Sequence, residues 1–282
     1  MPALDTGHDY LKEIEAWHAA RIECLTAPDG WLSLVGLEWL KPGMNRIGSG
    51  ADNDIVLPKA PPHLGTIDWS DDGTLSMTFD PASDATVDGK SAAHALLLDD
   101  SHSAPGVVAF GSANFIVIDR DGRKALRVRD SEAATRTGFA GIERFVVDPH
   151  WRIVADWQPL DPPFQLATGT VIGTIENHPA PGKAVFERDG RRFELYPVLE
   201  MPGDRQLFLV FADLTSGKET YGAARFLYAD MPLEDRIVLD FNKAYNPPCA
   251  FTPYATCPLA PPENRLGLRV TAGELKYRKP IR

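Results

Sequence analysis

The side chains best suited to chemistry gather in one proline-rich segment, Asp240 to Asn264. Six prolines fall within residues 240–266, and each fixes the backbone and removes an N–H donor, so neither a helix interior nor a central strand fits. Four aromatic residues in the same stretch offer too much apolar area for a disordered linker. We therefore predict a long ordered loop, a kind of segment that is usually functional or tightly structural.

The loop and the sequence before it supply the candidate site residues. The candidate catalytic residues are Tyr221, Lys243 and Tyr245, whose hydroxyls and amine suit acid/base chemistry. The candidate ligand-binding residues are Arg225, Asp240, Asn242, Asn246, Tyr254 and Asn264.

Arg225 is the expected anchor for an anion. If residues 220–229 form a strand, Tyr221 and Arg225 share one face, and the guanidinium could grip a carboxylate there. A salt bridge from Arg225 to Asp213 or Asp240 that merely closes the sheet is the alternative.

Other chemistries find little support in the sequence. Seven residues separate Cys249 from Cys257 and no histidine is nearby, whereas about two to four residues separate the cysteines of a zinc knuckle. We predict no metal and no cofactor, and favour a disulfide or two buried thiols. A nucleophilic cysteine would need Lys243 or the distant His178 close by. Residues 213–218 lack the spacing of a phosphate-binding loop and suit a hairpin turn.

Composition sets the class of protein. The chain has 282 residues, a net charge of -10 and 24% charged residues, without a concentrated basic patch. Nucleic acid and anionic membranes are therefore not expected partners. The first residues lack the pattern of a signal peptide, and no apolar window reaches the roughly 18 residues of a membrane span, so we expect a cytoplasmic protein.

The apolar pattern predicts a mainly β protein. Apolar positions three to four apart predict one helix over residues 8–27, which ends at the Pro28–Gly30 turn signal. Short β-type segments at roughly ten-residue spacing up to about residue 147 predict a β-sandwich. Prolines interrupt residues 148–182, where we expect no continuous central strand and expect part of the stretch to be linker. The resulting divisions are a helix over 1–30, a sandwich over 31–147 and a β-rich ligand-site unit over 148–282, with a barrel-like or curved sheet.

The first half resembles the forkhead-associated (FHA) β-sandwich. The resemblance rests on residues 44–90, with MNRIGSGADNDIVLP, PPHLGTIDW and ATVDGKSA in that order. That family holds phosphothreonine with arginine and serine side chains at places where this chain has Ser49 and Pro61–Pro62. Losing those donors removes the phosphate chemistry, so the resemblance implies the architecture alone. Arg46 as a substitute phosphate ligand is less expected than Arg46 as an exposed arginine.

Longer motifs make a second resemblance. GWLSLVGLEWL, TSGKETYGAARFLYAD, AGELKY and the proline-rich loop resemble the bacterial family known as domain of unknown function 1684. The resemblance runs from residue 9 to 277 and implies no activity, so whether the protein is an enzyme stays open.

Three functions follow as hypotheses. The first is that the C-terminal β unit binds, and in its stronger form also transforms, a small polar or anionic molecule. The second is a non-catalytic interaction module whose N-terminal sandwich docks a protein partner. A metal-dependent hydrolase is the remote third.

Overall fold

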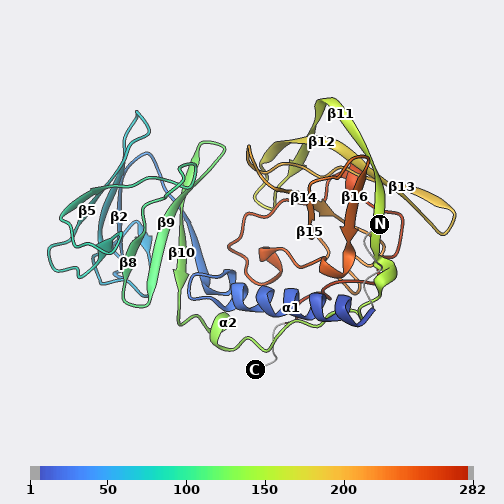
Figure 1. The fold of residues 1–282 in the computed structure, drawn as a ribbon. Helices are drawn as coiled ribbons and strands as arrows, with labels where there is room; N and C mark the ends of the chain where they lie inside the picture. The colour runs from blue at the N-terminus through green and yellow to red at the C-terminus, as the bar shows by residue number, and fades with distance from the viewer. Residues whose placement is uncertain (1–6, 279–282) are drawn as a thin grey trace. The chain divides into compact units, whose positions relative to one another are not determined.

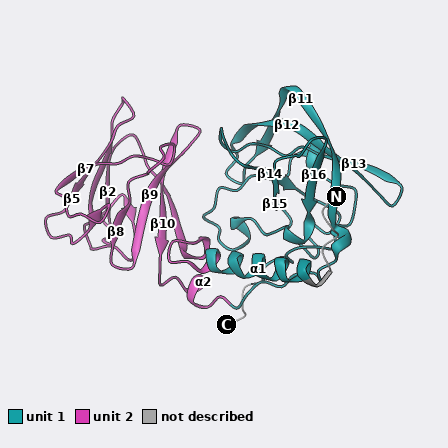
Figure 2. Cartoon of the chain, viewed as in Figure 1, with its two compact units in different colours: residues 1–24, 140–282 teal, residues 25–139 magenta. Residues whose placement is uncertain are grey.

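The structure is a computed structural model that describes residues 7–278, and it divides into two compact units (Figure 2). Unit 1 combines residues 1–24 with residues 140–282, and unit 2 comprises residues 25–139. The sequence places domain boundaries at residues 30 and 147. In the structure the N-terminal helix joins the C-terminal unit instead of standing alone.

Unit 2 is a sandwich of two five-stranded sheets. One sheet has the order β1-β10-β9-β8-β6 and the other β3-β2-β4-β5-β7. Their bounds are β1 (Leu34–Trp39), β2 (Gly43–Gly48), β3 (Ile55–Val56), β4 (Gly65–Trp69), β5 (Leu75–Phe79), β6 (Thr86–Val87), β7 (His94–Leu96), β8 (Val108–Phe110), β9 (Ala113–Arg120) and β10 (Arg123–Asp130). The short helices η1 (Trp31–Ser33) and α2 (Ala134–Thr137) flank the strands.

Side chains from both sheets fill the space between them. Ile47 and Ile67 of one sheet share a buried cluster with Phe115 and Leu126 of the other, and all four are completely or almost completely enclosed. Period-two alternation places these residues on the inner face of each strand. Figure 1 shows the two sheets facing one another, as the segment pattern predicts.

The turn that resembles a phosphopeptide site is occupied by the chain itself. Arg46 donates through Nε to Asp54 at 3.1 Å, and Asn53 donates to the carbonyl oxygens of Gly50 and Pro62, both at 2.8 Å. A Cβ on Gly48 would lie 2.2 Å from the Pro62 carbonyl oxygen. The turn is therefore closed on its own backbone, and Arg46 is the exposed strand arginine expected from the sequence.

Unit 1 contains α1 and two sheets. Its helix is α1 (Gly7–Thr26), of which residues up to Cys24 belong to this unit. One sheet has the order β13-β12-β11-β16, and β14 pairs with β15. Their bounds are β11 (Arg152–Gly169), β12 (Ile175–Arg188), β13 (Arg191–Leu195), β14 (Gln206–Phe211), β15 (Arg225–Asp230) and β16 (Arg236–Asp240). The short helices are η2 (Pro149–Trp151), η3 (Phe241–Lys243), η4 (Pro248–Ala250) and η5 (Pro262–Asn264).

The sequence predicts that part of residues 148–182 is linker, whereas the structure has strand over most of this stretch. This stretch forms most of a long antiparallel ribbon of β11 and β12, whose register shifts between Pro159 and Phe164. β16 pairs with β11 only up to Asp156, and β13 pairs with β12 only from Ala184. The prolines therefore lie where one edge of each strand is open, and a missing N–H there removes no ladder bond.

The proline-rich loop is ordered, as predicted. Its aromatic residues Phe241 and Phe251 are almost completely buried, and the three short helices η3, η4 and η5 fall within it. Tyr245 exchanges two backbone hydrogen bonds with Phe226 of β15, at 3.0 and 2.9 Å. Burial and backbone pairing hold the loop against the β15 strand.

Candidate functional site

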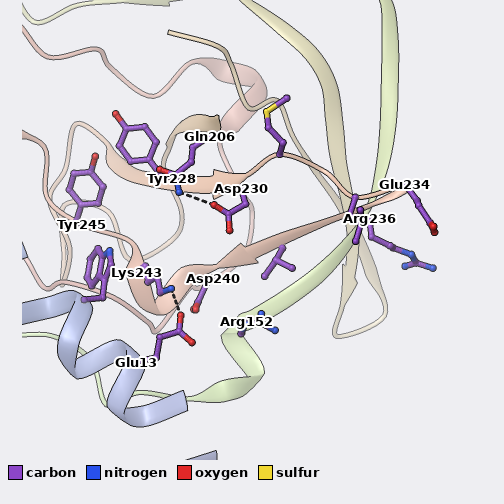
Figure 3. Close-up of a pocket in the computed structure, with 15 residues that line it drawn as sticks. Glu13, Arg152, Gln206, Tyr228, Asp230, Glu234, Arg236, Asp240, Lys243 and Tyr245 are labelled. Carbon is purple, nitrogen blue, oxygen red and sulfur yellow. Dashed lines mark hydrogen bonds and ion pairs between the residues drawn. The ribbon is translucent and has the colours of Figure 1, made fainter. Parts of the chain in front are cut away.

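A cavity of about 740 Å³ lies within unit 1, between α1, the strands β14, β15 and β16 and the start of the loop (Figure 3). Its lining is rich in charged and aromatic side chains. The lining residues are Glu13, Trp17, Arg152, Gln206, Tyr228, Ala229, Asp230, Met231, Leu233, Glu234, Arg236, Val238, Asp240, Lys243 and Tyr245. Concave sites of this size with convergent polar groups are where small molecules usually bind.

Asp240 is the most enclosed carboxylate of the lining, with 6% of its surface exposed. Its Oδ1 accepts a hydrogen bond from the Tyr10 hydroxyl at 2.7 Å and another from the Asn242 backbone N–H at 3.2 Å. Its Oδ2 has no hydrogen-bond partner among the described residues. Burial raises the pKa of Asp240 above its ordinary value, since water cannot solvate the charged form.

The raised pKa predicts how stability depends on pH. As pH rises above 3.8, the ordinary value, the unfolded carboxyl releases its proton before the folded one, so ionisation of Asp240 favours unfolding. We expect Asp240→Asn, which cannot ionise, to gain free energy of unfolding relative to the unmodified protein as pH rises. Denaturant titrations across about pH 4 to 8 measure this difference. A difference that stays constant with pH would contradict the burial of the charge.

Lys243 and Glu13 form an ion pair at the same end of the cavity. Lys243 Nζ lies 2.5 Å from Glu13 Oε1, and the exposed Arg152 lines the same region (Figure 3). Glu13 comes from α1 and Lys243 from η3. The pair therefore joins the N-terminal helix to the loop at this end of the cavity.

Aromatic rings form one side of the cavity. Tyr228 and Tyr245 lie nearly parallel, with centroids 6.4 Å apart and 16° between planes, and Trp17 lies 6.4 Å from Tyr245. Burial, and for Tyr228 also its hydrogen bond to Glu200, raises the pKa of both tyrosines. Both hydroxyls therefore stay protonated at neutral pH, and the Tyr228 hydroxyl donates to Glu200 at 2.6 Å.

Arg225 lies outside this lining and is enclosed by protein. It is 1% exposed, forms a salt bridge to Asp213 at 2.7 Å, and donates to the carbonyl oxygens of Val270 and Ala272. Burial lowers its pKa, and Asp213 opposes that change. Arg225 therefore forms a salt bridge that closes the sheet, which is the alternative to its role as an anion anchor.

Tyr221 is also separate from the cavity. The expected strand over residues 220–229 begins only at Arg225, so Tyr221 and Arg225 do not share a strand face. The Tyr221 hydroxyl donates to the Cys249 carbonyl at 3.2 Å. Cys249 and Cys257 do not form a disulfide, and Cys257 Sγ accepts a hydrogen bond from the Cys249 backbone N–H at 3.2 Å. The expected disulfide is therefore not formed, and of the two thiols Cys257 is buried and Cys249 is partly exposed.

The three predicted asparagines brace the loop instead of facing the cavity. Asn242 donates to Tyr10 and to the Asp148 carbonyl, at 2.9 and 2.8 Å. Asn246 donates to Glu274 at 3.0 Å, and Asn264 exchanges two hydrogen bonds with the Tyr196 backbone. Tyr254 is 36% exposed and does not line the cavity. Of the nine candidates, Asp240, Lys243 and Tyr245 meet in the cavity.

Most of the lining is absent from the candidates named on sequence. Glu13 and Trp17 lie more than 200 residues before the loop, and the helical period alone gives no reason to assign them to it. Arg152 and Gln206 begin separate strands. Tyr228 could have been named as a candidate, because it belongs to the motif TSGKETYGAARFLYAD.

Two further findings concern metals and membranes. Within residues 7–278, no group of three or more His, Cys, Asp or Glu side chains is placed to hold a metal ion. No helix in the described part of the chain is long and apolar enough to cross a membrane.

Fold and cavity define a mainly β protein with a charged, aromatic-lined cavity in its C-terminal unit. Residues 137–275 match the family described as "Protein of unknown function (DUF1684)", and the chain belongs to this family. This match covers most of unit 1 but not α1.

Solved structures give further similarities. An uncharacterised protein of Haloarcula marismortui, solved by NMR in solution, is 31% identical over 50% of this chain and 78% of its own, with a TM-score of 0.42. The FHA domain of FhaA, solved with the intracellular domain of another protein, is 19% identical over 33% of this chain and 97% of its own, with a TM-score of 0.23. A second FHA structure, from a study of phosphothreonine-dependent interactions, is 20% identical over 33% of this chain and 92% of its own, also at 0.23. None of the curated proteins compared matches the chain.

Proposed function

We propose that the protein binds a small polar molecule in the cavity of unit 1. The observation that carries the proposal is the meeting of Asp240, Lys243 and Tyr245 with Glu13 and Trp17 of α1 around a space of about 740 Å³. Five separate elements supply the charged and aromatic side chains. Such convergence of polar groups on a concave space is typical of a ligand site.

The charged groups of the cavity are held in place before any ligand enters. Tyr10 and Asn242 fix one oxygen of Asp240, and Glu13 fixes Lys243 at 2.5 Å. Fixed groups lose little conformational entropy when a ligand binds, which favours affinity. The fixed charges and the protonated hydroxyls of Tyr228 and Tyr245 could also orient a bound substrate. The proposal therefore includes, in its stronger form, a chemical transformation of the bound molecule.

Two lysine variants test the site. Lys243 pairs with Glu13 inside the cavity, and Lys183 pairs with Glu194 at 2.8 Å outside it, with similar side-chain exposures of 26% and 21%. We expect members of a panel of small polar compounds, charged and neutral, to bind the unmodified protein in ligand-observed NMR. Lys243→Met should change the affinity of a charged member by about threefold or more, since a charge near the ligand is removed.

The direction of that change reports the charge of the ligand. A cation should bind more tightly after Lys243→Met, and an anion more weakly. Lys183→Met should leave every affinity unchanged. If no compound binds, or if the two variants behave alike, the cavity is not the ligand site.

A further inference from the structure

The cavity has more uncompensated negative than positive charge. Its lining holds four carboxylates, Glu13, Asp230, Glu234 and Asp240, and three cations, Arg152, Arg236 and Lys243. Lys243 is paired with Glu13 within the lining. Arg236 lies 2.6 Å from Asp156, and 3.8 Å from Asp235, both outside the lining. With those pairs set aside, Arg152 alone remains to face three carboxylates.

Asp240 adds a specific demand for a positive partner. Only 6% of its surface is exposed, the hydrogen bonds from Tyr10 and Asn242 all reach Oδ1, and Oδ2 accepts none from the described residues. A buried carboxylate oxygen without a donor destabilises the fold, because it has lost its hydrogen bonds to water and no protein group replaces them. A positive charge in the cavity would offset that cost through the low dielectric around it.

The aromatic side of the cavity suits the same kind of group. Tyr228 is 40% exposed, and Tyr245 already carries a cation on its ring, with Arg21 Cζ 4.5 Å from the centroid. Arg21 is itself neutralised by Glu274 at 3.4 Å. Electron-rich ring faces attract ammonium and guanidinium groups, most strongly where water is excluded.

We propose that the cavity recognises a small molecule through an ammonium group, held against Trp17, Tyr228 and Tyr245 and facing the carboxylates of Asp240 and Asp230. The proposal rests on the function proposed above and specifies the class of ligand. An anion is disfavoured because Arg225, the best anion anchor on sequence, is enclosed with Asp213.

Asp230 is the carboxylate best placed for direct contact. It is exposed at the end of β15, and its Oδ1 accepts a hydrogen bond from Gln206 Nε2 at 2.9 Å (Figure 3). Its second oxygen can face a ligand, and since the side chain is exposed, Asp230→Asn should fold normally.

A matched pair of probes separates charge from shape. Choline and 3,3-dimethylbutan-1-ol have the same outline, and only choline carries a positive charge. We expect choline to bind the unmodified protein at least about tenfold more tightly than the neutral alcohol in ligand-observed NMR titrations at constant ionic strength. Asp230→Asn should weaken choline about threefold or more, and Lys243→Met should strengthen it. Glu187→Gln, which removes an exposed carboxylate of β12 outside the cavity, is the control and should change nothing.

Each other outcome has a separate meaning. If the alcohol binds as well as choline, or if acetate or phosphate binds and choline does not, the ammonium proposal is overturned while the cavity remains a ligand site. If choline binds equally well to Asp230→Asn, Lys243→Met and Glu187→Gln, it binds elsewhere, and the proposal also fails. If neither the probes nor the wider panel binds, both proposals fail together.

Discussion

Arg225→Ala is expected to lower the free energy of unfolding by about 3 to 5 kcal/mol, the largest effect of any substitution considered. The side chain is 1% exposed, and its removal leaves the Asp213 carboxylate buried without its cation. The carbonyl oxygens of Val270 and Ala272 also lose a donor. Urea denaturation followed by circular dichroism measures the change. A variant that unfolds at the same urea concentration as the unmodified protein would contradict this structural role.

The control is Arg236, which also pairs with an aspartate but lies on the surface. Arg236 lies 2.6 Å from Asp156, close to the 2.7 Å of Arg225 and Asp213, but both side chains are more than half exposed. Because water screens an exposed pair, Arg236→Ala should cost only about 0 to 1 kcal/mol. The double variant Arg225→Met/Asp213→Leu should recover part of the loss of Arg225→Ala, since it removes the unpaired charge.

Asn264→Ala is expected to lower the free energy of unfolding by about 2 to 4 kcal/mol. The side chain is fully buried, accepts from the Tyr196 backbone N–H at 2.8 Å, and donates to the Tyr196 carbonyl at 3.1 Å. Alanine leaves both backbone groups without these partners inside the protein. Urea denaturation of Asn264→Ala beside Asn177→Ala, an exposed asparagine of β12, checks the size of the effect. Equal losses in the two variants would contradict it.

Local signals in the sequence predict the elements well. The helix expected over residues 8–27 spans Gly7–Thr26, and the Asp-Gly pair at 189–190, a typical hairpin sequence, joins β12 to β13 with φ of 53° and 69°. Period and turn chemistry are properties of neighbouring residues, so a single sequence contains them. The prediction of linker failed at β11 and β12 for a physical reason. A proline disrupts a sheet only where its missing N–H faces another strand, and the sequence does not show which edge of a strand has a neighbour.

The site was less accessible to such reasoning. The loop is ordered, as predicted, and Asp240, Lys243 and Tyr245 line a cavity. Arg225 illustrates the limit, because an arginine that grips a ligand and one that closes a core have the same local sequence. What separates them is enclosure with Asp213, which depends on how strands distant along the chain assemble.

The discontinuous composition of unit 1 has a consequence for biosynthesis. The ribosome delivers α1 first, yet Asp240 and Tyr245, which Tyr10 and Trp17 contact, are made only after all of unit 2. During translation the apolar side chains of the helix therefore stay unpacked until the loop is made, while residues 25–139 can already fold around their own core. The cavity is complete only when the two ends of this unit meet, so a nascent chain arrested before the loop emerges would carry a folded sandwich and no site.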